Sequence, residues 1–408
     1  MKSKVYVNLK GLSLYGFCLL IAYLAGRYVG GYLDFLFYVL LAFPVISFLL
    51  LSISAANVRQ HQEFDTEHPV KGQVVAYTLV LTNEWVLPIP FVRVRFKEMN
   101  PLMRRVLPEF SAYVKSEEGL ERIFDIQCPF RGVYTVGLES LELEDMLHLF
   151  GMRVSVWFRT FYVYPRVRML RVFFTGLENL ERKTEGLAVV GLPDYSLFNT
   201  LKSYRYGESV RHMYWKKFAG TGTPYLKEYE SAAQPGVALY FDARKGARIG
   251  RAELELEDTS VEILVALVRY YLDRGIPTTV RAPGRNLYTF NGDHPAQFGD
   301  FYNSTLNLVF EETYSPGLLY RVDRDAELYD LQSVFFVTHL LDPMLFGLLE
   351  ESLATDYTVT VVFNQSGYSP AECEQNLNYF NRIRDRGGRI LVVSSAESIV
   401  EDLESNIE

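Results

Sequence analysis

The chain has 408 residues, with 49 acidic and 41 basic side chains and a formal net charge of −8. This length allows two or three domains with buried cores, and the acidic balance argues against a general affinity for nucleic acids. The three cysteines, Cys18, Cys128 and Cys373, are far apart and have no paired spacing. They predict neither a disulfide framework nor a thiolate metal site.

Two apolar segments without charge open the chain, at residues 11–26 and 35–56. A helix needs about 20 apolar residues to cross the hydrocarbon core of a bilayer; the second segment meets this length, and the first is marginal. A cleavable signal peptide is the alternative interpretation of the first segment. Because the second segment follows after a short link, we predict a transmembrane helical hairpin over residues 1–58.

The distribution of cations predicts the orientation of this hairpin. Lys2, Lys4 and Lys10 precede the first segment, Arg27 lies between the two segments, and Arg59 follows the second. Cytoplasmic loops of membrane proteins carry an excess of Lys and Arg. We therefore expect a multi-pass protein of the cell membrane whose soluble domains face the cytoplasm.

Residues 59–165 show the short alternating patterns of antiparallel strands. Residues 72–83 and 91–98 alternate apolar with polar side chains, and turn residues interrupt the pattern at intervals. Such a series predicts an antiparallel β-sandwich of immunoglobulin-like class. We interpret the alternating cations Arg93, Arg95 and Lys97 as a solvated strand face, with a binding face as the alternative.

The pattern changes after a linker and an aromatic ribbon, which together occupy residues 166–235. In residues 236–408, continuous apolar runs alternate with helical periodicity, which predicts an α/β domain with a doubly wound parallel sheet. Asp242 stands at the end of the first run. Ligands bind beyond the carboxyl ends of such strands, so Asp242 is a candidate ligand position; a capping role is the alternative.

The ribbon at residues 204–230 concentrates aromatic and cationic side chains around a Gly-Glu turn. These residue types suit stacking on nucleic-acid bases, but the acidic residues of the ribbon and of the whole chain argue against a nucleic-acid partner. Trp, Tyr and Arg also dominate the energetics of protein interfaces. Two interpretations stay open: the ribbon packs internally against the parallel sheet, or it forms a surface for a protein partner.

The ribbon resembles the signature of the domain of unknown function 58 family. The matching positions are Tyr204, Gly207, Arg211, Trp215, Lys216, Ala219, Lys227 and Glu228, while Glu208 stands where the family has Asp and Met213 where it has Ile. Residues 131–134, 145–151 and 163–165 also look like family segments. The resemblance covers nearly the whole chain, and we take the signature residues, Glu208 included, as candidate interaction residues.

The resemblance implies two membrane spans, a β domain, the signature and a von Willebrand factor A-like domain, in that order. It also implies a membrane-tethered accessory protein with a MoxR-type AAA ATPase and a transglutaminase-like protein as candidate partners. In von Willebrand A domains the metal loop reads Asp-x-Ser-x-Ser. Here Arg244 and Gly246 replace both serines after Asp242, and His339, followed by Asp342, stands where a further aspartate is expected. We predict a degenerate site at Asp242, with no functional metal or other cofactor.

The leading hypothesis is a non-enzymatic, membrane-anchored scaffold that presents these domains to cytoplasmic partners. The alternatives are a metal-dependent ligand-binding domain and an unrecognised hydrolase. The hydrolase would need Asp242, His339 and Asp342 together in a solvent-filled pocket, and no motif of recognisable catalytic spacing supports it.

Overall fold

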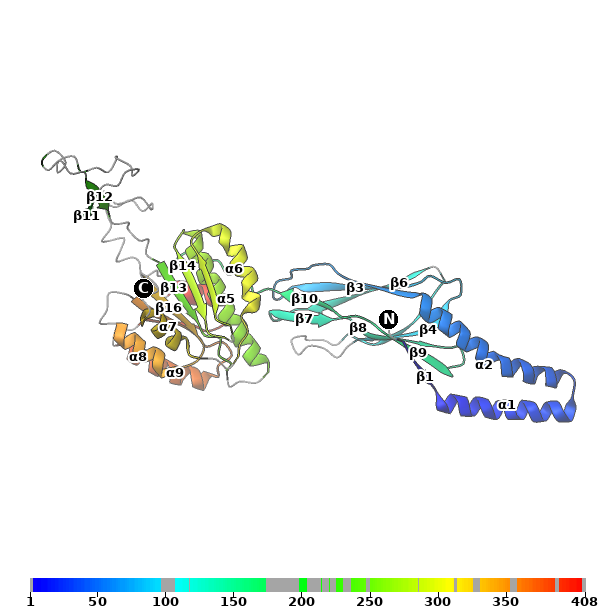
Figure 1. The fold of residues 1–408 in the computed structure, drawn as a ribbon. Coiled ribbons are helices and arrows are strands. Elements are labelled where there is room, and N and C mark those ends of the chain that lie inside the picture. The colour runs from blue at the N-terminus through cyan, green and yellow to red at the C-terminus, as the bar shows by residue number, and fades with distance from the viewer. Residues whose placement is uncertain are drawn as a thin grey trace. The chain divides into compact units, whose positions relative to one another are not determined.

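The computed structural model falls into two units, Met1–Arg166 and Val167–Glu408, each described by itself (Figure 1). The described residues are 3–96, 107–173 apart from 117, 198–203, 214, 220, 225–229, 236–246, 250–311 apart from 285, 314–325, 331–352, 358–385 and 389–405.

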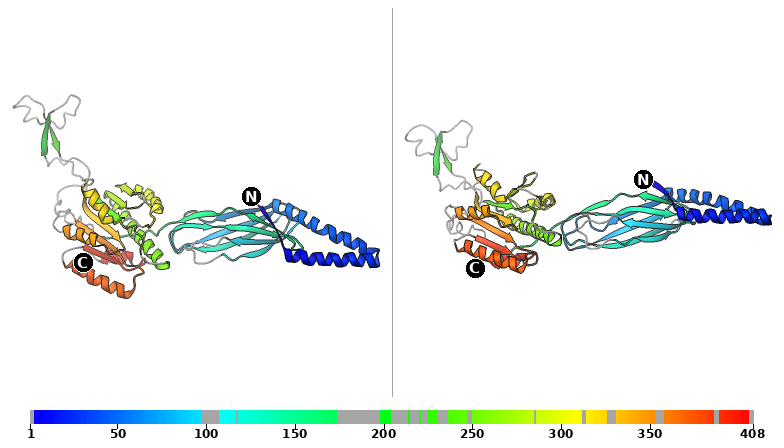
Figure 2. Two further views of the ribbon diagram at one scale, coloured as in Figure 1. Left: turned by 60° about the horizontal axis from the view of Figure 1, so that its bottom comes forward. Right: turned by 90° about the horizontal axis from the view of Figure 1, so that it is seen from below.

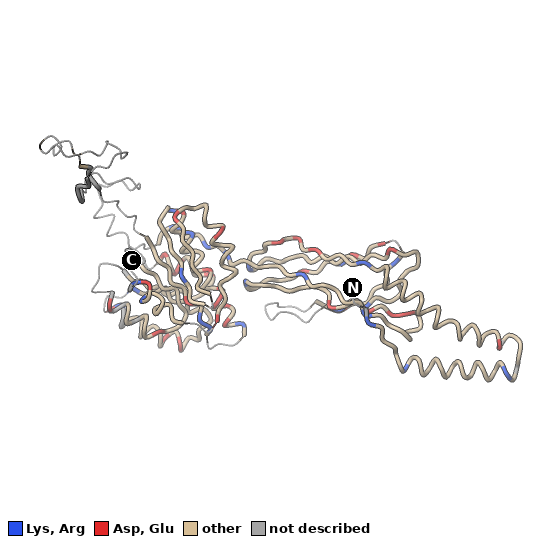
Figure 3. The backbone as a smooth tube through the Cα atoms, viewed as in Figure 1, with Lys and Arg blue, Asp and Glu red and all other residues tan. Residues whose placement is uncertain are grey.

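Two long apolar helices lie near the start of unit 1. Helix α1 spans Leu9–Val29 and α2 spans Tyr32–Asn57, and by length and composition both could cross a membrane. They lie side by side, and the Tyr15 hydroxyl donates to the Leu40 carbonyl at 2.7 Å. Charged residues are sparse along both helices (Figure 3). The prediction of two N-terminal apolar helices is confirmed.

Antiparallel strands make up the rest of the described part of unit 1. Their bounds are β1 Ser3–Val7, β2 Val58–Phe64, β3 Val74–Asn83, β4 Ile89–Phe96, β5 Phe110–Val114, β6 Gly119–Gln127, β7 Gly132–Val136, β8 Leu138–Glu144, β9 Phe150–Ser155 and β10 Arg159–Val163. One sheet has the order β1-β9-β8-β4-β5, a second β2-β3-β6, and β10 pairs with β7. Side chains from these sheets share one core, which includes Tyr77, Val94 and Phe161.

Strands β1 and β2, which the sequence pattern does not predict, connect the helices to the sheets. Strand β1 precedes α1 and pairs with β9, with Val5 opposite Met152. Strand β2 continues α2 without a linker, because Asn57 ends the helix and Val58 begins the strand. Both helices therefore leave the same end of the β sheets (Figure 2).

The interpretation of the alternating cations of β4 as a solvated face needs a correction. Arg93, Arg95 and Arg153 all reach Glu142 of β8, at N–O distances of 3.8, 3.3 and 2.5 Å. Glu142 is only 2% exposed. These half-exposed cations therefore neutralise a buried carboxylate of the neighbouring strand and do not simply form a solvated face. Lys97 lies outside the described residues.

Unit 2 is built on a mixed sheet of mostly parallel strands. The bounds are β13 Gly236–Phe241, β14 Thr278–Ala282, β15 Tyr288–Gly292, β16 Leu331–Thr338, β17 Thr358–Asn364 and β18 Arg389–Val393. Their order is β15-β14-β13-β16-β17-β18. All neighbours are parallel except β15, which pairs antiparallel with β14 at the edge. The expected α/β character of this part is confirmed.

Helices cover both faces of this sheet, which explains why the inner strands are apolar on both sides. The bounds are α5 Arg251–Asp273, α6 Phe298–Ser304, α7 Pro316–Asp325, α8 Pro343–Ser352, α9 Pro370–Arg384 and α10 Ile399–Glu404, with single 3-10 turns at Pro295–Gln297 and Thr305–Asn307. Helices α5, α6 and α10 share one core with the sheet, and α7, α8 and α9 share the other. Helix α7 is absent from the sequence predictions.

Candidate functional site

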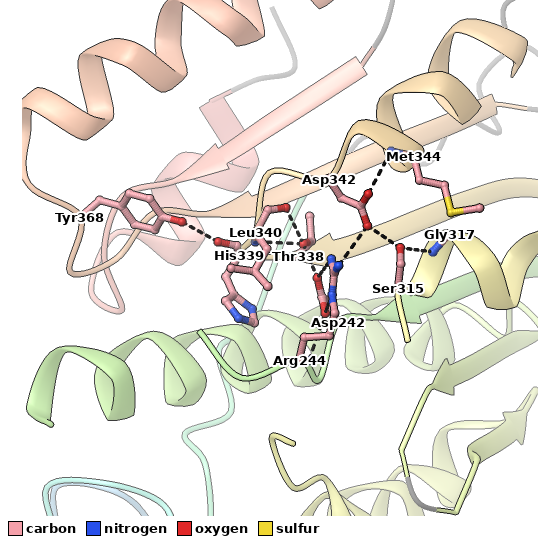
Figure 4. A network of polar contacts seen from close by, with 10 residues as sticks. All are labelled: Asp242, Arg244, Ser315, Gly317, Thr338, His339, Leu340, Asp342, Met344 and Tyr368. Atoms are coloured by element: carbon pink, nitrogen blue, oxygen red, sulfur yellow. Dashed lines mark hydrogen bonds and ion pairs between the residues drawn. The ribbon is translucent and has the colours of Figure 1, made fainter. Parts of the chain in front are cut away.

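A cluster of polar side chains lies at the carboxyl ends of β13 and β16 (Figure 4). Asp242 directly follows β13, and Thr338 is the last residue of β16. The two strands are parallel neighbours, and the Asp242 backbone N–H donates to the Val337 carbonyl at 2.8 Å. Because the carboxyl ends of parallel strands meet at one edge of a sheet, the fold brings together residues that lie far apart in the sequence.

The guanidinium of Arg244 bridges two carboxyl groups in this cluster. Its Nε donates to Asp242 Oδ1 at 2.9 Å, and its Nη2 donates to Asp242 Oδ2 at 2.7 Å. Its Nη1 lies 3.1 Å from Asp342 Oδ2. The planar fork of arginine suits such two-pronged contacts with a carboxylate. Asp242 is fully buried, whereas the Arg244 side chain is 20% exposed.

The surroundings keep Arg244 charged. Burial alone lowers the pKa of the guanidinium, but its hydrogen bonds to Asp242 and the charges of Asp242 and Asp342 outweigh burial and raise the pKa above its ordinary value. Arg244 is therefore a permanent cation between two carboxyl groups.

Hydroxyl groups and two backbone amides hold the two carboxyl groups in place. Thr338 Oγ1 donates to Asp242 Oδ2 at 2.7 Å, and Ser315 Oγ donates to Asp342 Oδ2 at 2.5 Å. Asp342 Oδ1 accepts from the backbone N–H of Met344, so this side chain also caps the start of α8. Asp242 Oδ1 accepts from the Arg244 N–H at 3.1 Å, which adds a turn-capping role to its contact with the guanidinium.

The oxygen atoms of this cluster are of the type that Mg²⁺ prefers, but the arrangement does not fit a metal ion. Arg244 occupies the space between the two carboxyl groups and bonds to both. Lys245, the next residue, is exposed, and its backbone N–H donates to the Glu311 carbonyl at 3.0 Å. Within the described ranges, His, Cys, Asp and Glu side chains form no group of three or more that could hold a metal.

His339 lies next to this cluster in the chain and is buried. Its ring centroid lies 5.7 Å from that of Phe310, and its carbonyl accepts from the Tyr368 hydroxyl at 2.6 Å. The three residues of the hydrolase hypothesis are thus neighbours. However, Asp242 is 0% exposed, and both carboxyl groups are engaged by Arg244. A general base needs access to a substrate proton, and this geometry does not provide it.

The signature residues fall largely outside the described part of the chain. Strand β11 (Phe198–Ser203) pairs antiparallel with β12 (Tyr225–Tyr229), which places Lys227 opposite Leu201 and Glu228 opposite Thr200. Outside the described residues lie Tyr204, Gly207, Glu208, Arg211, Trp215, Lys216 and Ala219. Internal packing and a partner surface therefore both stay open for this ribbon.

A second polar cluster connects α2 to the turn between β8 and β9. Asp145 is 3% exposed. Its Oδ2 accepts from Ser47 Oγ of α2 at 2.7 Å, and its Oδ1 accepts from the Phe150 N–H at 2.8 Å. The rings of Phe48 and Phe150 meet beside it, with centroids 5.3 Å apart. The turn is therefore fastened to the apolar helix by hydrogen bonds and by packing.

The same turn also holds β1 and the start of α1. The Asn8 N–H donates to the Leu149 carbonyl at 2.9 Å. A side chain at Gly151 would collide with the Tyr6 ring, whose hydroxyl donates to Glu144 Oε1 at 3.2 Å. Burial first, and then the charges of Glu144 and Glu142, raise the pKa of Tyr6 to about 12. We call residues 145–151, which contact both helices or their flanking strand, the helix clasp.

Several residues of these clusters are absent from the sequence predictions. Thr338 ends an apolar run next to that of Asp242, so the common edge of parallel strands was a usable signal. Ser315 and Ser47 carry no comparable signal, because their partners are distant in the sequence. The helix clasp was indicated only by its resemblance to a family segment.

Comparisons with known proteins assign no family. No protein-family model and no curated protein matches the chain. Among solved structures, proximal thread matrix protein 1 from the mussel byssus is 14% identical, with 42% of this chain and 46% of that chain covered and a TM-score of 0.28. The sporulation control protein Spo0M from Bacillus subtilis is 10% identical, with 26% and 49% covered and a TM-score of 0.17. The chain spans about half the length of these two structures, and similarity at this level carries no argument about fold or function.

Proposed function

We propose that this protein is a non-enzymatic scaffold, anchored in the cell membrane by a two-span hairpin, that presents its soluble domains to cytoplasmic partners. The observation that carries the proposal is the pairing of β1 with β9. A strand before the first helix and a strand after the second helix belong to one sheet, so both must lie on the same side of a bilayer. Two crossings satisfy this condition, and a single crossing does not.

The exposure of the helices supports anchoring. Only 6% and 11% of the two apolar segments are buried, and Leu9, Phe17 and Phe35 are 77%, 60% and 71% exposed. A soluble protein would bury such helices in its core, whereas lipid tails provide an apolar environment for them. Cleavage as a signal peptide would remove β1 and leave the edge of β9 unpaired, which disfavours that alternative. The cations around the hairpin then favour the cytoplasmic side.

We extend the proposal to the identity of the domains. The two antiparallel sheets of unit 1 suit an immunoglobulin-like sandwich, and the Tyr134 hydroxyl donates to the Phe130 carbonyl at 2.8 Å in the manner of a tyrosine corner. The parallel order of unit 2, with helices on both faces, suits a von Willebrand factor A-like domain. Together with the signature at residues 204–228, these features support membership of the domain of unknown function 58 family.

The bridging arginine supports a binding role without catalysis or metal dependence. Arg244 supplies an internal cation where related loops would hold Mg²⁺. The charges of the carboxyl groups at the ends of β13 and β16 are therefore balanced without an added ion. By resemblance, the candidate partners are a MoxR-type AAA ATPase and a transglutaminase-like protein. The acidic balance of the chain argues against a nucleic-acid partner.

The partner proposal is tested by affinity capture of the full chain in mild detergent, followed by identification of co-purifying proteins. We expect an ATPase of this type in the captured fraction. Trp215→Ala is the matched variant. A folded variant that loses the partner assigns the ribbon to the interface, and a variant that no longer folds assigns it to internal packing. Wild-type protein that captures no ATPase or other stable partner would count against the scaffold.

The side of the membrane is tested by protease protection in vesicles of known orientation. In inside-out vesicles, we expect protease added outside to digest both soluble units and to leave a protected fragment that contains α1 and α2. Digestion only in right-side-out vesicles would contradict the cytoplasmic location while leaving the scaffold role open.

A further inference from the structure

Exposed apolar side chains occupy a loop beside the end of α2. This loop, residues 84–88, starts where the helix stops, because the Glu84 N–H donates to the Asn57 carbonyl at 3.2 Å and Glu84 Oε2 lies 3.2 Å from Arg59 Nε. In the loop, Val86 is 70% exposed and Leu87 is 45% exposed.

The helix clasp places a similar side chain beside the start of α1. Asn8, the residue before α1, donates to the carbonyls of Leu149 and His148 at 2.9 and 3.1 Å. In the clasp, Met146 is 66% exposed. Exposed apolar side chains therefore lie on the two helices and on two loops that contact the residues flanking those helices. We call residues 84–88 and the helix clasp together the helix-side end of unit 1.

Hydrogen bonds fix the loop that carries Val86 and Leu87. The Trp85 N–H donates to Asn83 Oδ1 at 3.1 Å, and Asn83 Nδ2 donates to the Leu87 carbonyl at 2.8 Å. Ser116 Oγ donates to the Trp85 carbonyl at 3.0 Å. Because the backbone is held, the loop cannot easily turn these side chains inward. Their transfer out of water into an apolar environment is favourable.

The short connections identify what covers this end. Only Asn8 separates β1 from α1, and α2 continues into β2 with its last turns packed in the core of unit 1, where Leu51 is buried. If the helices span a bilayer, as proposed above, the helix-side end is held at the bilayer surface with no spacer for an intervening protein. Leu9, the first residue of α1, is exposed at the same end.

We propose that the helix-side end of unit 1 docks on the bilayer surface, with Val86, Leu87 and Met146 at the boundary between headgroups and acyl chains. Interfacial segments typically bury their apolar side about 5–10 Å into this boundary. Docking holds the β domain upright on its two helices and sets its orientation toward cytoplasmic partners. The inference rests on the proposed membrane anchor.

The chain offers a matched pair of fluorescent probes, because its three tryptophans are Trp85, Trp157 and Trp215. Trp85 lies in the docking loop. Trp157 lies two residues beyond β9, a strand that runs away from α1, and its carbonyl accepts from Gln62 Nε2 within β2. Both side chains belong to unit 1, and Trp157 is 82% exposed. A difference in quenching between Trp85 and Trp157 by lipid therefore reports depth in the bilayer and not merely accessibility to solvent.

The test uses the full chain in vesicles of phosphatidylcholine with brominated acyl chains. One variant keeps only Trp85 (Trp157→Phe, Trp215→Phe), and the other keeps only Trp157 (Trp85→Phe, Trp215→Phe). We expect the lipid to quench Trp85 roughly two-fold or more above Trp157, because quenching needs proximity to the acyl chains. Val86→Ser with Leu87→Ser should remove most of the difference, while the protein still floats with the vesicles.

Equal quenching of the two tryptophans in protein that floats with the vesicles overturns the docking and leaves the anchor standing. Protein that does not float contradicts the anchor itself, and with it the docking. Flotation and quenching are measured separately, so the two failures are distinguishable.

Discussion

Asp145 in unit 1 and Asp242 in unit 2 are both buried carboxyl groups, and the donors that satisfy them differ in kind. Asp145 accepts from a serine hydroxyl and from backbone amides of its own turn. Asp242 accepts from a threonine hydroxyl and from the guanidinium of Arg244, which also reaches Asp342. One carboxyl group is solvated by neutral dipoles and the other by a full positive charge.

The difference in donors matches the structural role of each carboxyl group. Asp145 fastens a turn to an apolar helix, where an unpaired cation would be costly to bury. Asp242 lies at a sheet edge where loops with oxygen ligands hold Mg²⁺ in other proteins, and there a cation is needed to balance two carboxyl groups. Two carboxyl groups of similar burial can thus be satisfied with or without a charged donor, and loss of the donor should cost a different amount of stability in each case.

The largest expected effect follows from loss of the cation in unit 2. Arg244→Ala leaves Asp242 buried without its main donor. We expect the free energy of unfolding of unit 2 to fall by about 3 kcal/mol, the low end for a broken buried pair because Arg244 is partly exposed. Urea unfolding followed by hydrogen exchange of peptides from unit 2 measures this loss. Lys245→Ala, at an exposed neighbour, should change it by less than about 0.5 kcal/mol.

Removal of the carboxyl group in unit 1 should cost less. Asp145→Ala leaves the Ser47 hydroxyl and the Phe150 N–H without an acceptor, which predicts a loss of about 2 kcal/mol. Ser47→Ala removes one neutral donor and should cost about 1 kcal/mol. Hydrogen exchange of peptides from residues 138–155 measures the loss of stability in both variants. A loss for Ser47→Ala as large as that for Arg244→Ala would break the distinction between neutral and charged donors.

Replacement of the cation by an oxygen ligand should make unit 2 respond to metal. Arg244→Ser opens the space between Asp242 and Asp342 and adds a hydroxyl. At Mg²⁺ about ten-fold above its Kd we expect about 1.4 kcal/mol of stabilisation, or roughly 3–6 °C in Tm. Arg244→Ser with Asp242→Asn is the control and should not respond. An equal shift in the wild-type protein would show that Arg244 does not exclude the ion.

Alkaline pH should separate the neutral donors from the charged donor. Tyr6, whose pKa is raised to about 12, donates to Glu144 while it is protonated. Its contribution is complete below the ordinary tyrosine pKa of about 10 and is lost as pH rises toward the folded value. Tyr6→Phe should therefore destabilise unit 1 by about 1 kcal/mol at pH 9, with the difference vanishing near pH 12.

The same pH range should leave the donor of unit 2 intact. The raised pKa of Arg244 keeps its guanidinium protonated throughout. The hydrogen-exchange protection of peptides from residues 236–246 should not change stepwise between pH 10 and 12 in the wild-type protein. A stepwise change that Arg244→Ala abolishes is therefore not expected. Such a step would indicate that the guanidinium titrates in this range.

The apolar helices and the parallel strands were predictable because each depends on a continuous run of residues. The run that ends at Asp242 reads as a buried strand from composition alone. Strand β1 was not predictable from its own residues, because they form a strand only by pairing with β9, about 145 residues later. Helix α7 (Pro316–Asp325) is short but amphipathic, so its pattern was a usable signal that the prediction missed; Tyr320 belongs to the core that α7 shares with the sheet.

The candidate site was predictable in position and not in arrangement. Asp242 was identified because ligands bind beyond the carboxyl ends of parallel strands. The loss of both loop serines indicated a changed metal loop. From the sequence, Arg244 was only an obstacle to a metal ion. Its contact with Asp342 depends on how a loop and the start of α8 converge, which no local pattern records.

The pairing of β1 with β9 in the membrane-bound protein tests the central claim most directly. Val5 lies opposite Met152, so Val5→Cys with Met152→Cys should react with a short thiol crosslinker. A protease site placed within residues 97–106 then yields two fragments that stay joined. Val5→Cys with Val133→Cys is the control and should separate. Joined fragments in native membranes are the predicted result, whereas a mature chain that lacks residues 3–7, or fragments that separate, would contradict an uncleaved hairpin with both ends on one side.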